Sequence, residues 1–422
     1  MNACVQKYYG SRLESSCDLQ TSAASCSLSC RPPPRSVTDA LSQVHPEVTK
    51  RFFGCGLPFP AKLEGCRVLD LGSGSGRDSY AFSKLVGSSG HVTGIDMTEE
   101  LITVSRQYVE YHQKKFGYEE PNVSFVQGYM EKLSEAGIQS DSMDVLLSNC
   151  VVCLCPDKGA VLQQAYNVLK VSLENFYQLD EKKRCDILFL ALTVSCLRFI
   201  QEGGELYFSD MYASKVVPDH MTQDPVLWGK ITLYYLLVSS KKNPCSTNMQ
   251  SHVNMQCHAF VWALGEGMGG AQFWQDFISL ARSVGFSTPH LVSASNIVIY
   301  NSDLKAKAGD ISYASGTYRL FKLPKSPLVS EATVTYKGTV AEFPHQLDFD
   351  SSHCFKTDVA VKVNGEMAAI LQSSRFSSDF KIQTSDKPES SSESTPQYCH
   401  LNPFLLADKL GSSVKQCSKT KK

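Results

Sequence analysis

The sequence predicts an α/β fold, in which a mostly parallel sheet carries helices on both faces and a small β-rich domain follows. Three observations favour it. Short apolar runs alternate with amphipathic runs between residues 67 and 210, as in chains of alternating strands and helices. A glycine-rich turn follows the first apolar run. The chain has 422 residues, 42% of them hydrophobic, which suffices for one large domain and a smaller one.

The elements of the large domain follow from the period of the apolar residues. Residues 98–117 form the clearest helix, since Leu101, Val104, Tyr108 and Tyr111 recur at helical spacing. Strands are predicted at 67–71, 91–96, 123–128, 143–149 and 203–210, and further helices at 76–86, 158–170 and 271–286.

Four regions are predicted along the chain. Residues 1–60 form an N-terminal arm that contains thiols, and residues 61–323 form the main domain, which ends in strand-like runs at 290–300 and 316–323. Residues 324–383 form the small domain, with strands expected at 332–340, 345–350 and 357–363. Residues 384–422 are rich in Ser, Lys and Pro, so we expect a disordered tail.

Composition excludes several classes of protein. The net charge of -1 gives no general attraction for nucleic acid or anionic membranes. The longest apolar run, 187–200, is interrupted by Arg198 and is shorter than the ~20 residues of a membrane-spanning helix. The N-terminus has no apolar signal segment. We therefore expect a cytosolic protein, without a nucleic-acid or membrane partner, and a monomer.

The sixteen cysteines are scattered, unlike the dense disulfide framework of a small secreted domain. Cys150 and Cys153 form a CxxC pair, but no second pair follows at the spacing of a zinc site. Most cysteines are therefore expected to be small buried side chains.

The strongest motif is the turn after the first strand. Asp70 closes the strand, and Gly72, Ser73, Gly74 and Gly76 lead into a helix. Glycines allow a tight turn and a close approach of the backbone to a ligand. The acidic residue ahead of the glycines suits a cationic or hydroxylated ligand better than a pyrophosphate.

Further candidates lie at the ends of the next three strands, where parallel sheets bind their ligands. Asp96 ends the second strand and Met97 follows it, and the Asp96 carboxylate can bind both ribose hydroxyls of a nucleoside. Alternatively, Asp96 only caps the next helix. Met130 and Glu131 follow the third strand as candidate adenine contacts, and Asn149 closes the fourth.

These motifs resemble those of class I methyltransferases, Rossmann-like enzymes that use S-adenosylmethionine. More specifically, the sequences around residues 5–10, 52–57, 127–133, 146–151 and 373–382 resemble the arsenite methyltransferase family. The resemblance covers roughly 5–170, 203–229 and 265–383. It implies a small-molecule substrate, trivalent arsenic, that is methylated in steps.

The resemblance also implies roles for cysteines. Cys55 and Cys150 match arsenic ligands, and arsenic is a soft ion that prefers thiolates. Cys26 matches a cysteine thought to form a disulfide with the Cys55 position during turnover, although Cys30 competes for that role. Glutathione or thioredoxin would then regenerate the thiols. Cys153 and Cys155 are expected to be packing or incidental thiols.

Three features depart from the family pattern. Residues 171–202 and 230–264 are long, atypical insertions, and loops of such length are unusual between core elements. We interpret them as intron sequence translated in frame, since Val171 codons begin with GT and Gln201 can be encoded by CAG. The alternative is a lid or partner-binding insertion. Gly267 stands where the family has a fourth cysteine, which predicts weak activity.

Two other functions remain open. The chain could methylate another small molecule, which requires a base near the methyl group, or it could be a non-catalytic protein that binds metalloids through thiols.

Overall fold

The structure is a computed structural model, and it describes residues 2–11, 13, 15–19, 21–22, 33–170, 203–224, 232–233, 261–262, 267–324, 331–384 and 398–413. Cys26, Cys30 and the whole of the segment 171–202 lie outside the described residues. Of the second atypical segment, only β6 (Thr232–Leu233) and β7 (Val261–Trp262) are described, and they pair antiparallel.

The core is an eight-stranded sheet of order β3-β2-β1-β4-β5-β10-β9, with β8 (Gln272–Phe273) paired to β5. The pairs from β3 to β5 are all parallel, whereas β10 is antiparallel to both of its neighbours. The predicted, mostly parallel sheet is therefore confirmed. The strands are β1 (Arg67–Leu71), β2 (His91–Asp96), β3 (Val123–Gln127), β4 (Val145–Asn149), β5 (Glu205–Ala213), β9 (His290–Ile297) and β10 (Tyr313–Phe321).

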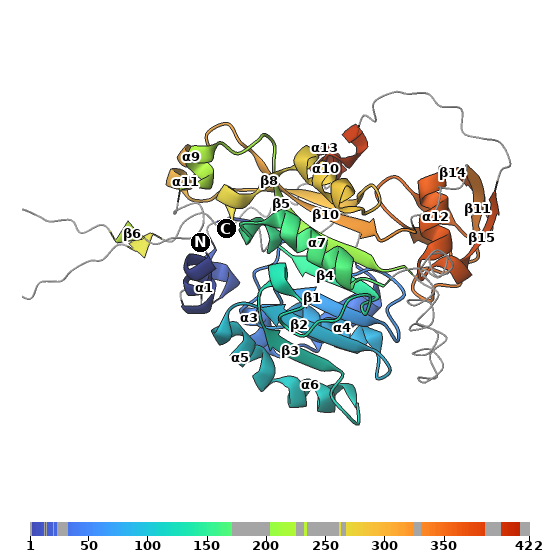
Figure 1. Cartoon of the computed structure of the whole chain (residues 1–422), viewed down its shortest axis with the longest axis horizontal. Helices are drawn as coiled ribbons and strands as arrows, with labels where there is room; N and C mark the ends of the chain where they lie inside the picture. The colour runs from blue at the N-terminus through green and yellow to red at the C-terminus, as the bar shows by residue number, and fades with distance from the viewer. Residues whose placement is uncertain are drawn as a thin grey trace, which may run out of the picture.

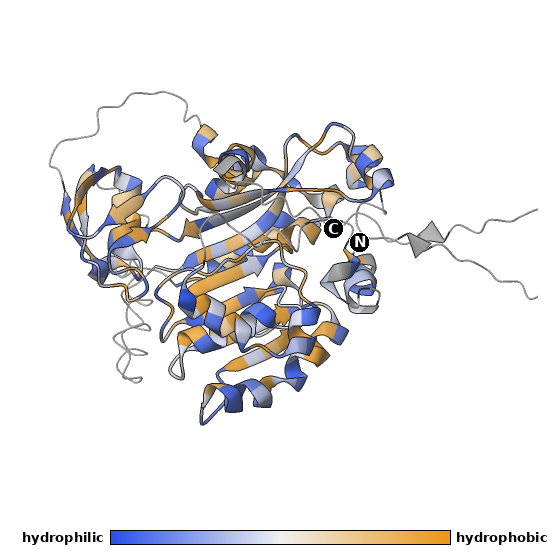
Figure 2. Ribbon diagram, turned by 180° about the vertical axis from the view of Figure 1, so that it is seen from behind, coloured by the Kyte–Doolittle hydropathy of each residue, from blue (hydrophilic) through white to orange (hydrophobic). Residues whose placement is uncertain are grey.

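Helices cover both faces of this sheet because its strands are apolar on both sides. Along β1, Val68 packs with α4 (Arg77–Val86) and the N-terminal arm, and Leu69 packs with α7 (Lys158–Val168) and α10 (Trp274–Val284) on the other face. Figure 2 shows mostly hydrophobic strands between helices that carry polar residues outward. None of the helices in the described part of the chain is long and apolar enough to cross a membrane.

The helix predicted at 98–117 is two helices, α5 (Glu99–Gln107) and α6 (Val109–Phe116). The break falls at Tyr108, whose φ of -107° and ψ of 11° are not helical. There the Tyr108 ring stacks on His45 with 4.1 Å between ring centroids. The contact with the N-terminal arm thus accompanies a bend that the periodic pattern alone did not indicate.

The N-terminal arm contributes α1 (Asn2–Ser11), η1 (Ser16–Asp18), α2 (Arg35–Ser42) and α3 (Pro46–Lys50). Helix α1 contacts α5, and Gln6 donates a side-chain hydrogen bond to the carbonyl of Met97 at 2.8 Å. Ser75 in the glycine turn donates to the carbonyl of Val48 at 2.8 Å. The arm is therefore attached to both the glycine turn after β1 and the loop that begins at Met97 after β2.

The C-terminal unit lies at the opposite end of the molecule from α1 (Figure 1). It has a three-stranded antiparallel sheet, a hairpin and a helix that the sequence reasoning missed. The elements are β11 (Ala332–Tyr336), β12 (Gln346–Asp348), β13 (Cys354–Lys356), β14 (Ala360–Val363), α12 (Gly365–Ser373), η9 (Ser377–Asp379) and β15 (Phe380–Thr384).

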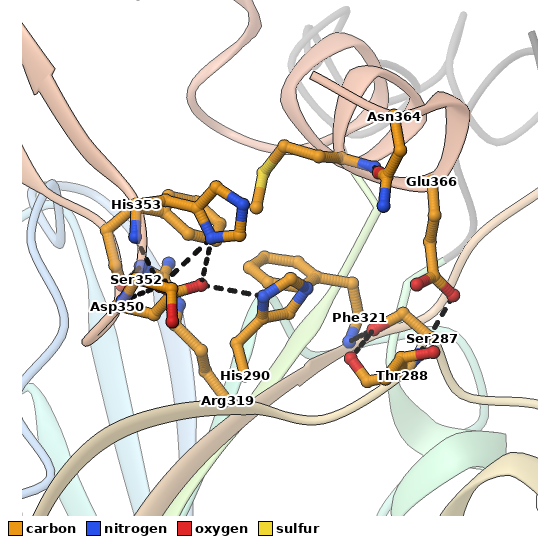
Figure 3. A network of polar contacts seen from close by, with 12 residues as sticks. Ser287, Thr288, His290, Arg319, Phe321, Asp350, Ser352, His353, Asn364 and Glu366 are labelled. Carbon is orange, nitrogen blue, oxygen red and sulfur yellow. Dashed lines mark hydrogen bonds and ion pairs between the residues drawn. The ribbon is translucent and has the colours of Figure 1, made fainter. Parts of the chain in front are cut away.

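Polar contacts join this unit to the main sheet (Figure 3). Asp350 accepts hydrogen bonds from His290 of β9 and from His353, both at 2.8 Å. Arg319 of β10 lies beneath them and donates to the carbonyl of Phe349 at 2.9 Å. Buried Glu205 also binds Arg319, at 2.6 Å, and Arg375, which follows α12.

The expectation of a disordered tail over 384–422 is wrong for residues 398–413, which form η10 (Tyr398–Leu401) and α13 (Pro403–Ser413). Tyr318 donates a hydrogen bond to the carbonyl of Leu401 at 2.7 Å, and Asn296 donates to Asp408 at 2.9 Å. Leu401 packs in the same core as α7 and α10. Residues 398–413 bury apolar side chains against the sheet, and this burial stabilises their structure although the sequence around them is polar.

Two shorter helices complete the described part, α9 (Asp219–Thr222) and α11 (Ser302–Ala308). Both lie beyond the carboxyl end of β5, on the same side of the molecule as α1 (Figure 1). With η8 (Met268–Gly270), they place apolar side chains around the ends of β5 and β10.

Candidate active site

The strand order reverses direction between β1 and β4, which is where ligands bind in open α/β sheets. A pocket of about 920 Å³, including its open mouth, lies at the carboxyl ends of β1, β2, β3 and β4. Nine of the ten predicted cofactor residues line it: Asp70, Gly72, Ser73, Gly74, Asp96, Met97, Met130, Glu131 and Asn149. The structure therefore brings these nine residues to one cavity.

Gly76, the tenth, does not line the pocket but lies where the glycine turn enters α4. Its φ is 92°, and a Cβ there would lie 2.8 Å from the Phe125 ring. Gly74 has a φ of 53° and no neighbour within 4 Å of a Cβ position. The backbone at Gly74 thus faces open space, as a close approach by a ligand requires.

Asp96 makes a contact at the start of the next helix, one of the two alternatives from the sequence, and also lines the pocket, where the other alternative, ribose binding, stays a prediction. One carboxylate oxygen accepts from the Thr98 N–H at 2.8 Å, at the start of α5, and the other accepts from the Gly74 N–H at 2.9 Å. Burial raises the pKa of Asp96, although these hydrogen bonds lower it. The carboxylate therefore connects the glycine turn to β2 and also lines the pocket.

Asp70 is a second pocket carboxyl whose pKa is raised. Its carboxylate accepts from the Ser79 hydroxyl at 2.5 Å. Burial, followed by the nearby Asp78 carboxylate, raises the pKa of Asp70 to about 8. Neighbouring Ser73 has a buried hydroxyl without a hydrogen-bond partner among the described residues. A cationic ligand with polar groups fits this environment, because it would stabilise ionised Asp70 and supply a partner for Ser73.

Helix α1 and the segment 51–54 also line the pocket, a role that no motif in the sequence indicated. Tyr9 and Phe53 contact each other at 5.4 Å between ring centroids, and both face the cavity. The Arg77 guanidinium lies 3.3 Å from the centroid of the Phe52 ring. The arm therefore covers one side of the pocket, although no charged or periodic signal marks Tyr9 or Phe53 in advance.

Asn149 holds the Cys55 segment against the end of β4. Its side-chain oxygen accepts from the backbone N–H groups of Cys55 and Gly56 at 2.9 and 3.1 Å. Its amide nitrogen donates to the Gly56 carbonyl at 3.0 Å and to Asp78 at 2.7 Å. These four contacts use both the oxygen and the nitrogen of one side-chain amide, so Asn149 positions the Cys55 loop beside the pocket.

Cys150 has a φ of 61°, a conformation that costs free energy for a non-glycine residue and often marks a functional site. Its thiol lies within hydrogen-bonding reach of the Cys153 and Cys55 thiols. These hydrogen bonds, together with burial, raise the pKa of Cys150. The two predicted arsenic ligands are therefore neighbours, and Cys150 also lines the pocket at the ends of the strands.

Cys153, expected to be a packing or incidental thiol, belongs to the same cluster. It lies on η4 (Val152–Leu154) and is 1% exposed. The ligand atoms of Cys150, Cys153 and Asp210 all lie within 4.8 Å of one another. Cys150 lowers the pKa of Cys153 by a hydrogen bond, but burial and Asp210 raise it to about 11. Cys155 is outside this cluster and packs in the core around α7.

Comparison with known proteins agrees with the geometry. The chain is 40% identical to mouse arsenite methyltransferase over 96% of its own length and 90% of that protein. It is 39% identical to the human protein of that name, covering 98% and 93% of the two chains. The chain belongs to the arsenite methyltransferase family.

Family models and a crystal structure support that assignment. A methyltransferase domain matches residues 62–256, and an arsenite methyltransferase C-terminal domain matches residues 329–422. An arsenic(III) S-adenosylmethionine methyltransferase from Chlamydomonas reinhardtii is similar with a TM-score of 0.65 and 34% identity, over 84% of this chain and 97% of that one. The predicted class I methyltransferase fold and enzyme class are confirmed, with S-adenosylmethionine as cosubstrate.

Within this family assignment, Gly267 has an informative position. It precedes η8 with a φ of 87°, and a Cβ at residue 267 would lie 3.0 Å from the Cys153 sulfur. The position at which the resemblance led us to expect a fourth cysteine therefore faces Cys153 directly.

Proposed function

We propose that this methyltransferase transfers the methyl group of S-adenosylmethionine to trivalent arsenic held by Cys55 and Cys150, first on arsenite and then on its monomethyl product. The observation that carries the proposal is one shared cavity. Cys150 lines the same pocket as the glycine turn and Asp96, and its thiol is beside Cys55. Soft thiolates at this place suit a thiophilic acceptor.

The chemistry needs positioning more than proton transfer. Arsenite exchanges each hydroxide for a thiolate, and each thiol proton leaves with a hydroxide as water. The bound arsenic keeps its lone pair, which attacks the methyl carbon as the sulfonium bond breaks and S-adenosylhomocysteine leaves. The methylated arsenic is then pentavalent and cationic. A further thiolate attacks one arsenic-bound sulfur to form a disulfide, and the electron pair of the broken As–S bond returns arsenic to the trivalent state. Arsenic has no proton to lose, so the protein has to hold two reactants in line. No histidine occurs among the described residues that line the pocket, which disfavours an acceptor that needs such a base.

Each part of the cavity has a place in this proposal. Asp96 would accept hydrogen bonds from the ribose hydroxyls, Met97 would flank the ribose, and Met130 and Glu131 would contact the adenine. Asp70, Gly72, Ser73 and Gly74 would hold the amino-acid part. Asn149 would act indirectly, through its four contacts with the Cys55 loop and Asp78.

We further propose that Cys26 forms a transient disulfide with Cys55 during turnover, which glutathione or thioredoxin reduces, and that the protein works as a cytosolic monomer. The resemblance supports the role of Cys26, and Cys55 has a free thiol.

An acceptor assay tests the function. The full chain is incubated with methyl-labelled S-adenosylmethionine, glutathione and one acceptor at a time, namely arsenite, a phenol, an amine or a β-diketone. We expect label only in methylated arsenicals. Label in one of the other acceptors would support the alternative small-molecule methyltransferase. Tight arsenite binding without any methyl transfer would support the non-catalytic thiol protein.

A further inference from the structure

We infer that Cys153 is the third sulfur ligand of arsenic in this chain, and completes a site with Cys55 and Cys150. The inference rests on the proposed function, since it takes trivalent arsenic as the substrate. It changes the ligand set that the resemblance implies, because Cys153 there has no role and position 267 supplies the additional thiol.

The thiols converge from three separate segments of the chain. Cys55 comes from the loop after α3, Cys150 from the end of β4, and Cys153 from η4. The Cys150 thiol is within hydrogen-bonding reach of the other two. Trivalent arsenic takes up to three thiolates around a pyramidal centre, so Cys150 and the two thiols within its reach match the coordination number of arsenic.

The position of Cys153 is fixed by hydrogen bonds rather than by packing alone. Its backbone N–H donates to one Asp210 carboxylate oxygen at 2.8 Å, and the Met211 N–H donates to the other at 2.8 Å. Asp210 lies in β5, a central strand of the sheet, and is 4% exposed. A buried carboxylate that binds two backbone amides aligns η4 with β5, and this alignment keeps the Cys153 thiol beside Cys150.

Position 267 supports the same conclusion. A side chain there would begin 3.0 Å from the Cys153 sulfur and 3.0 Å from a Leu154 methyl group. The Cys153 thiol therefore occupies the space into which a thiol at 267 would extend. Glycine at 267 leaves room for the Cys153 side chain. Cys153 can therefore take the place of the cysteine that the resemblance predicts at position 267.

The surroundings suit a soft, uncharged centre. Met211 and Met268 pack in the same cluster as Cys55 and Cys153, together with Leu154 and Ala271. Apart from the Asp210 carboxylate, which lies within 4.8 Å of the Cys150 and Cys153 sulfurs, this environment is apolar and favours an arsenic tris-thiolate, which carries no net charge. Binding is a ligand exchange without electron transfer. Three As–O bonds break, three As–S bonds form, and three thiol protons leave in three water molecules.

Arsenic K-edge X-ray absorption on the full chain with one equivalent of arsenite tests the inference. We expect three sulfur neighbours in the wild type and two sulfurs with one oxygen in Cys153→Ser. Arsenite affinity should fall by about tenfold or more in that variant, which corresponds to about 1.4 kcal/mol. Cys155→Ser is the matched control, because this thiol is buried nearby but outside the cluster. It should keep three sulfur neighbours and the wild-type affinity.

The outcomes separate the two proposals. Three sulfurs in Cys153→Ser overturn the role of Cys153 while the proposed function stands. A wild type that binds no arsenite through sulfur overturns both. Cys153→Ala serves as a second variant if the serine disturbs the fold, and S-adenosylmethionine binding by calorimetry shows whether each variant is folded. Two sulfurs in the wild type and in both variants also overturn the inference.

Discussion

The backbone N–H of Gly204 donates a hydrogen bond to the carbonyl oxygen of Lys170 at 3.0 Å, although residues 171–203 lie between them in the sequence. Lys170 is itself fixed, because its N–H donates to the Met143 carbonyl at 2.9 Å and its ammonium binds Asp144 at 2.5 Å. The described residues on the two sides of the atypical segment 171–202, Lys170 and Gly204, therefore lie next to each other beside the sheet.

Deletion of residues 171–202 should leave the fold intact, because Lys170 and Gly203 can be joined directly. We expect unchanged S-adenosylmethionine binding, an unchanged or higher melting temperature and a higher soluble yield, since the apolar run 187–200 is removed. Calorimetry and thermal unfolding measure these properties. A deletion variant that no longer binds the cofactor would show that the segment is an integral part of the domain.

Asp96→Ala should lower the affinity for S-adenosylmethionine by tenfold or more, since hydrogen bonds to a charged group contribute ~1.5–3 kcal/mol. The substitution also removes the acceptor for the Gly74 and Thr98 N–H groups, so Asp96→Asn is the matched control. Asparagine keeps one acceptor oxygen and should lose less affinity. Isothermal titration calorimetry that finds wild-type affinity for Asp96→Ala contradicts the assignment.

Cofactor binding should release a proton at neutral pH. The pKa of Asp70 is about 8 in the free protein, so its carboxyl is mostly protonated at pH 7. A bound cation favours the ionised form, and the proton leaves. Calorimetry in buffers with different ionisation enthalpies should show this release in the wild type but not in Asp70→Asn. Equal enthalpies in all buffers for the wild type would rule out the coupling.

The raised pKa of Asp70 also makes the stability of the fold depend on pH. An unfolded Asp titrates near ~3.9, whereas folded Asp70 titrates at about 8, so the folded protein holds an extra proton between these values. The contribution of Asp70 to stability is therefore complete below about pH 4 and is lost as the pH rises through 8. Asp70→Asn should reduce the fall of the melting temperature between pH 5 and pH 8.5, and an identical slope in the variant refutes this account.

Glu205→Gln should destabilise the protein strongly. Glu205 is fully buried and is ion-paired with both Arg319 and Arg375, and its neutralisation leaves two buried cations without a counter-charge. Loss of one partner from a buried ion pair costs ~3–5 kcal/mol. Urea unfolding measures the change. Glu110→Gln is the control, since the Glu110–Lys114 pair is exposed and should have no measurable effect.

The sequence indicated the parallel half of the sheet because its strands are short apolar runs with a clear end. The β1 run stops at the glycine turn, and the predicted range 67–71 is the observed one. The tail helix was harder to predict, since α13 is ordered by contacts with β9 and β10 and its flanks have a polar composition. Propensity and composition contain no information about such long-range contacts.

Some residues of the candidate site could also be predicted from the sequence, and others could not. Asp70, Gly74 and Asp96 could be identified because each lies at the end of a strand or directly after it, and strand ends meet at one edge of a parallel sheet. The place of Cys153 could not, since it depends on a short turn after β4 and on Asp210 from β5, which lies fifty-seven positions further along the chain. A CxxC spacing alone does not distinguish a packing thiol from a ligand.

A single-turnover experiment tests most directly whether the thiol cluster and the cofactor pocket form one active site. The full chain, loaded with methyl-labelled S-adenosylmethionine, is mixed with one equivalent of arsenite and glutathione, and labelled methylarsenical is quantified against Cys150→Ser. We expect the wild type to transfer the label to arsenic, and the variant to bind the cofactor normally but to transfer almost none. Equal transfer by wild type and Cys150→Ser, or none by a wild type with both reactants bound, would contradict the account.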